Sequence, residues 1–219
     1  MTRRVAVFAR YVAAVGLVAL SMARPAAAAI CVEVDLRFTD REPPAALVQA
    51  MQSEASSIWE PYGVWIQWSD AASAARCTGV QGSFDVFVER TRVRRPTSQG
   101  VTLGSTFLPI AAIDHAPIHV DQEATERTLA SLPVGQLLHL TGRLAPGPSD
   151  VGRALGRVLA HEIGHVILAA RAHQRGGLMR PAFRADDLIS RHRWPYRLSS
   201  AELARLRQRE IELDANAGY

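Results

Sequence analysis

The strongest helical pattern in the chain carries two histidines four residues apart. Apolar side chains recur at helical spacing between Leu155 and Ile167, and this stretch contains His161-Glu162-Ile163-Gly164-His165. On an α-helix, residues four apart differ by about 40° around the axis and by about 6 Å along it. The two imidazoles can therefore converge on one cation.

The residue types within this pattern indicate zinc chemistry. Neutral imidazole is a good zinc ligand. Glu162 lies about 100° around the helix from His161, where its carboxylate can reach a water molecule on the metal. The pattern predicts His161 and His165 as metal ligands and Glu162 as the general base of a zinc hydrolase. The alternative interpretation is a pair of ordinary helix histidines.

A catalytic zinc ion needs a third protein ligand and an open coordination position. His173 is the best placed of the remaining histidines. On an unbroken helix it would lie about 12 Å beyond His165, so the helix must end near residues 169–172 and the chain must turn back. The alternatives for the third ligand are His119, His192, Asp186 and Asp187.

These residues resemble the metzincin clan of zinc endopeptidases, and also a group of small secreted bacterial proteins with metalloprotease character. The likeness covers about residues 150–182 and includes Met179 in Gly177-Leu178-Met179-Arg180-Pro181. It implies that His161, His165 and His173 hold one catalytic zinc ion, that Glu162 is the general base, and that Met179 lies in a tight turn beneath the metal. It also implies a peptide or protein substrate, bound in extended form along an edge strand.

The sequence departs from the metzincin pattern in two ways. Seven residues separate His165 from His173, where the usual spacing is five. Leu168 stands where the pattern has glycine, so no glycine marks the turn that His173 requires.

The rest of the chain predicts an α/β (α+β) fold. Alternating apolar and polar residues or short β-prone runs predict strands at 31–38, 64–68, 84–88, 101–108 and 117–120. Helical patterns run from Pro43-Pro44 to Trp59, over 123–140 with an interruption at Pro133, from a cap at Ser149 or Asp150 to about Ala170, and onward from a capping box at Ser199–Glu202. We expect a mixed N-terminal sheet packed on the helix with the histidines, then a helical C-terminal part, in a zincin-like arrangement.

The first 29 residues differ from the rest. A basic start with Arg3, Arg4 and Arg10, a short apolar run over 11–20, and Ala26–Ala29 predict a cleaved signal peptide over 1–29. Residues 30–219 then form a single domain, secreted or periplasmic. No further apolar segment approaches about 18 residues, so we expect no membrane anchor.

Charge and cysteine content limit the classes of partner and the compartment that we expect. Four of the 25 basic residues and none of the 21 acidic residues lie within 1–29, so the remainder is balanced in charge and we expect no binding of nucleic acid. We also expect a monomer. Cys31 and Cys77 predict one disulfide in an oxidising compartment. Asp121 and Glu123 are a weaker candidate for a calcium site. The rival function is an extracellular module that binds zinc without cleaving peptides.

Overall fold

Five strands form one sheet, and two long helices pack on one of its faces. The computed structural model describes residues 30–69, 79–90, 103–106 and 116–217. The strands are β1 (Ile30–Phe38), β2 (Val64–Trp68), β3 (Gly82–Glu89), β4 (Gly104–Thr106) and β5 (Ala116–Asp121). The α-helices are α1 (Ala45–Trp59), α2 (Gln122–Ala130), α3 (Val134–Thr141), α4 (Pro148–Ile167), α5 (Ala185–Ile189) and α6 (Ser200–Ala217), with short 3₁₀ helices at Glu60–Tyr62 and Trp194–Tyr196.

The sheet has the strand order β2-β1-β3-β5-β4, with β4 antiparallel to its neighbour and the other pairs parallel. Val34 pairs with Phe84, and Val86 pairs with Ile118, so buried side chains from adjacent strands line up on one face. The predicted mixed N-terminal sheet is confirmed. The strands β3 and β5 extend beyond their predicted ends, and only Gly104–Thr106 of the predicted strand over 101–108 falls within the described residues.

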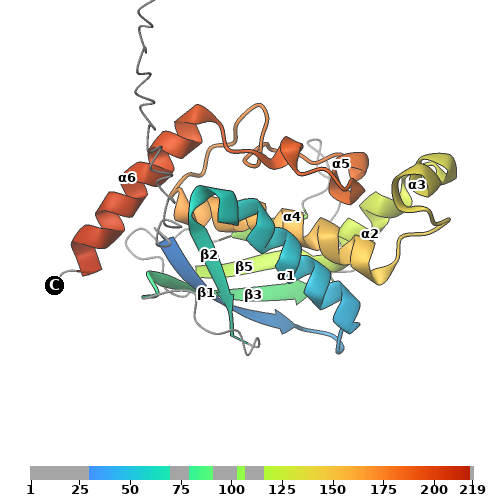
Figure 1. Ribbon diagram of the computed structural model, residues 1–219. Coiled ribbons are helices and arrows are strands. Elements are labelled where there is room, and N and C mark those ends of the chain that lie inside the picture. The colour runs from blue at the N-terminus through green and yellow to red at the C-terminus, as the bar shows by residue number, and fades with distance from the viewer. Residues whose placement is uncertain (1–29, 70–78, 91–102, 107–115, 218–219) are drawn as a thin grey trace, which may run out of the picture.

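Helices α1 and α4 lie side by side on the same face of the sheet (Figure 1). Gly152 and Gly156 of α4 make this close approach possible. A Cβ atom on Gly156 would lie 2.5 Å from the backbone oxygen of Met51, and one on Gly152 would collide with the backbone oxygen of Leu47. Trp59 at the end of α1 is fully buried and donates a hydrogen bond of 3.1 Å to Ala160 O, the carbonyl just before His161.

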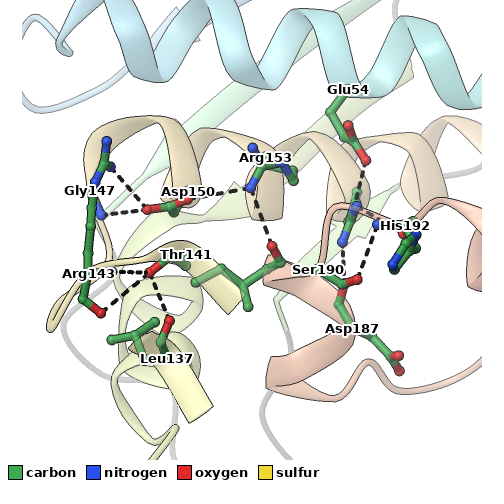
Figure 2. Close-up of polar contacts among 12 residues, drawn as sticks. Glu54, Leu137, Thr141, Arg143, Gly147, Asp150, Arg153, Asp187, Ser190 and His192 are labelled. Carbon is green, nitrogen blue, oxygen red and sulfur yellow. Dashed lines mark hydrogen bonds and ion pairs between the residues drawn. The ribbon is translucent and has the colours of Figure 1, made fainter. Parts of the chain in front are cut away.

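Both ends of α4 differ from the prediction. Gly147 is the N-cap and Pro148 the first helical residue, a position where the missing N–H of proline does no harm. Asp150 instead accepts hydrogen bonds from Gly147 N (3.0 Å) and Arg143 Nη1 (3.3 Å), as Figure 2 shows. The predicted cap at Ser149 or Asp150 is therefore wrong, and the helix ends at Ile167 rather than near Ala170.

The segment between α4 and α6, for which the sequence patterns predict no helix, contains α5 and a 3₁₀ helix. Arginines of α4 hold it in place (Figure 2). Arg153 donates to Ile189 O (3.3 Å), and Arg157 donates to Asp187 O and to His192 O (3.2 Å). A helix of five residues has too short a pattern to be recognised, and these contacts from α4 are absent from the local sequence.

Several predictions concern residues outside the described ranges. The signal peptide over 1–29 and Cys77 both lie there, so the cleavage and the Cys31–Cys77 disulfide stay predictions. Cys31 is buried at the start of β1. Within the described residues, no helix is both long enough and apolar enough to cross a membrane.

Candidate metal centre

His161 and His165 lie one turn apart on α4, and both are buried, with 5% and 7% of their surface exposed. Their Nε2 atoms are 3.1 Å apart, and the two rings meet edge to face. The helical spacing therefore brings the two imidazoles together as the sequence predicts.

Backbone carbonyls fix the protonation of both rings. His161 Nδ1 lies 2.7 Å from Leu178 O, and His165 Nδ1 lies 2.6 Å from Ala170 O. A carbonyl oxygen only accepts, so each Nδ1 must carry the proton, and in a neutral imidazole Nε2 then holds a lone pair. Burial, the largest cause, lowers the pKa of His161 to about 3 and lowers that of His165, which keeps both rings neutral.

Two nitrogen lone pairs thus face each other across 3.1 Å with no proton between them. Such an arrangement is repulsive unless a cation binds both nitrogens. The donor chemistry therefore fits a metal ion at this position.

His173 completes the group from the chain beyond the helix. Its ring stacks on His161 with a centroid distance of 5.2 Å and meets the ring of His165 edge to face at 4.9 Å. One ligand nitrogen from each of the three histidines lies within 4.8 Å of the other two. His173 is exposed, whereas the other two are buried, so the site opens to solvent on the side of the third ring.

The alternative third ligands lie elsewhere. His119 bonds Glu89 at 2.8 Å, Asp186 pairs with Arg184, and Asp187 pairs with Arg180. His192 is exposed, and its carbonyl oxygen accepts a hydrogen bond of 3.2 Å from Arg157 of α4. Within the described ranges, the three histidines are the only group of metal-binding side chains close enough to share an ion.

The weaker calcium candidates have other roles. Asp121 caps α2 by accepting a hydrogen bond of 2.8 Å from Ala124 N, and Glu123 pairs with Arg127 at 2.6 Å. Both side chains therefore serve the first turn of α2 rather than converging on an ion.

Glu162 faces β4, the last described strand of the sheet. A Cβ atom on Gly104 of β4 would lie 2.8 Å from Glu162 Oε1, so the strand backbone and this carboxylate are neighbours. Burial raises the pKa of Glu162 to about 8, and a cation held by the histidines would lower this pKa and favour the ionised carboxylate. The carboxylate therefore lies between α4 and the last described strand of the sheet, on the side where an extended chain could run along β4.

Met179 lies against the helix between the two buried histidines. It is buried, and its Sδ atom occupies the space that a side chain on Gly164 would need. Its carbonyl oxygen accepts a hydrogen bond of 2.8 Å from Gln174 N, which closes the loop that follows His173. Leu178, next to it, supplies the carbonyl that holds His161.

Phe183 and Tyr196 form an aromatic wall beside the site. Phe183 meets the ring of His161 edge to face at 5.2 Å, and Arg180 lies over both aromatic rings. Sequence reasoning does not predict these aromatics at the site. It missed the supporting carbonyls of Ala170 and Leu178, because no side chain marks them.

Comparisons with known proteins complete the description. No protein-family model and no curated protein matches the chain. Solved structures that match include a zinc-dependent peptidase from Methanocorpusculum labreanum, with 12% identity, 80% of this chain and 99% of that chain covered, and a TM-score of 0.47. Archaemetzincin from Methanopyrus kandleri matches with 13% identity, coverage of 84% and 97%, and a TM-score of 0.47. Likeness of this degree assigns neither a family nor an activity.

Proposed function

We propose that this chain is a zinc-dependent endopeptidase of metzincin-like arrangement. The observation that supports this most directly is the pair of Nε2 lone pairs 3.1 Å apart, each fixed by a carbonyl on the opposite nitrogen, with the third imidazole beside them. Three histidine ligands with a solvent-facing side are typical of catalytic zinc sites, whereas structural sites are closed by a fourth protein ligand.

Residues around the ion would have separate roles in peptide hydrolysis. Bound zinc would supply a Lewis acid that polarises a peptide carbonyl and acidifies a water molecule. Glu162 accepts the proton of the attacking water and returns it to the leaving amine. Met179 packs against Gly164, and we propose that it forms the floor of the metal site, the role that the metzincin resemblance implies.

The substrate is a peptide in extended form. β4 is the last described strand of the sheet, and its Gly104 lies next to Glu162. A peptide that pairs with such an edge gains backbone hydrogen bonds whatever its sequence. We propose that β4 guides the substrate past Glu162, in a secreted or periplasmic protein that acts as a monomer.

The test compares zinc content and proteolysis in the purified protein and three variants. We expect about one zinc ion per chain in the wild type and in Glu162→Gln, since Glu162 is not a ligand, and loss of zinc in His161→Ala and His173→Ala. Hydrolysis of an unfolded protein such as casein should fall by about 10²–10⁴-fold in Glu162→Gln.

Other results separate the alternatives. A wild type without zinc, even after reloading, would overturn the proposal. A zinc-loaded wild type that cleaves no peptide would instead favour the zinc-binding module. Full zinc content in His173→Ala would move the third ligand to a downstream carboxylate.

A further inference from the structure

The end of α4 turns sharply without a glycine. Ala169 N donates to Val166 O, and Ala170 N donates to His165 O, both at 3.1 Å, which is the hydrogen-bond pattern of a Schellman turn. The residue after the C-cap of such a turn has a left-handed backbone, and here Ala169 has φ 45°. A side chain in that conformation is strained, so the turn needs support from elsewhere.

Arg205 of α6 provides that support. Its Nε donates to Leu168 O and its Nη2 donates to Ala169 O at 2.7 Å. These are carbonyls that a helix leaves without partners at its end, and a cation is favoured there by the helix dipole. The planar guanidinium holds two adjacent carbonyls at once, which a single ammonium group does less well.

Helix α6 begins at a capping box. Ser199 N donates to Glu202 Oε2 at 2.5 Å, and Glu202 N donates to Ser199 Oγ at 3.3 Å, which is the predicted capping box. Leu206, next to Arg205, is buried. Figure 1 shows α6 at the end of the molecule where α4 ends.

The supported turn is joined directly to the ligands. Ala170 O, one residue beyond the carbonyls that Arg205 holds, binds Nδ1 of His165, and His173 follows three residues later. We infer that Arg205 is a positioning residue for the metal centre. It stabilises the glycine-free turn that orients His165 and returns His173 to the site. This role rests on the proposed zinc site but not on peptide cleavage.

The test measures zinc affinity by competition with a chromophoric chelator. We expect Arg205→Ala to weaken zinc binding about tenfold, as for other groups that support metal ligands, and Arg205→Lys to weaken it less. Arg207→Ala, an exposed arginine on the same helix, should bind zinc as the wild type does. Thermal unfolding of each metal-free variant shows whether it is folded.

A second substitution distinguishes a specific effect of Arg205 on the turn at Ala169 from a general loss of stability. Glycine adopts the left-handed conformation without strain, so an Ala169→Gly turn should depend less on Arg205. We therefore expect Arg205→Ala to reduce affinity by a smaller factor in the Ala169→Gly background. This double variant, together with Arg205→Lys, also keeps the test open if Arg205→Ala alone does not fold.

The outcomes are distinct. Unchanged affinity in a folded Arg205→Ala protein, or an equal loss in both backgrounds, would overturn the inference. A wild type that binds no zinc would overturn it together with the metal site. A wild type that binds zinc but cleaves no peptide would refute the proposed function alone, because the affinity measurements would still decide the role of Arg205.

Discussion

The two halves of α4 use polar residues in opposite ways. In the first half, the Arg157 side chain is fully buried and binds Glu54 Oε1 at 2.8 Å, while Arg193 binds the other oxygen of Glu54 at 2.8 Å. In the second half, His161 and His165 present lone pairs to each other. The charged side chains of the first half have their partners within the protein, whereas the facing lone pairs of the second half need a bound cation.

This difference predicts a division of labour along one helix. The contacts of the first half should determine the free energy of unfolding, and the side chains of the second half should determine metal affinity. Variants of the first half should therefore lower stability in the metal-free protein, and those that remain folded should still bind zinc.

The largest expected effect comes from Glu54→Ala. The change leaves Arg157 buried without its counter-ion, and breaking a buried pair in this way destabilises by about 3–5 kcal/mol. Urea unfolding of the metal-free protein measures this loss. Glu60→Ala, an exposed carboxylate just beyond α1, is the control and should change stability by less than about 0.5 kcal/mol. A loss below about 1 kcal/mol in Glu54→Ala would show that the pair is not what holds this half together.

A smaller effect is expected from Gly156→Ala. The added methyl group meets the backbone of α1, which cannot move aside as a flexible side chain can, and overpacking of this kind costs about 1–3 kcal/mol. Gly135→Ala in α3 adds the same group in open space and should be neutral or slightly stabilising. If both variants unfold at the same urea concentration, the close contact between α1 and α4 has no energetic importance.

The smallest of the three main effects is expected from Ala169→Gly, which should stabilise the protein. Glycine removes the strain of the left-handed backbone and should raise stability by about 1 kcal/mol. Ala170→Gly is the matched control, because among the described residues other than glycine only Ala169 has a positive φ. The control should lower stability or leave it unchanged. A destabilised Ala169→Gly would mean that the alanine methyl group packs usefully despite its conformation.

The sequence predicts those parts of the molecule whose causes are local. The positions of β1 and β2 follow from their apolar patterns, and the convergence of His161 and His165 follows from helical spacing alone. Ligand chemistry and the distance that the chain can span predict His173 as the third ligand, and the structure places it beside the other two histidines.

What the sequence does not predict depends on distant partners. The short helix α5 is held by arginines of α4, which lie 30 and 36 residues away in the chain. The end of α4 is set by Arg205, 36 and 37 residues beyond the carbonyls that it holds. Sequence periodicity and cap signals carry no information on such distant contacts. The ligand position of His173 therefore requires a turn after α4, but the local sequence, which has no glycine there, does not explain it.

The exposure of His173 also sets it apart from the other two histidines. The helix and two carbonyls hold His161 and His165 in place, whereas His173 stands on the chain beyond the helix, on the side that faces solvent. If the three side chains hold zinc, as we propose, release of the ion would depend on movement of His173 away from the other two rings.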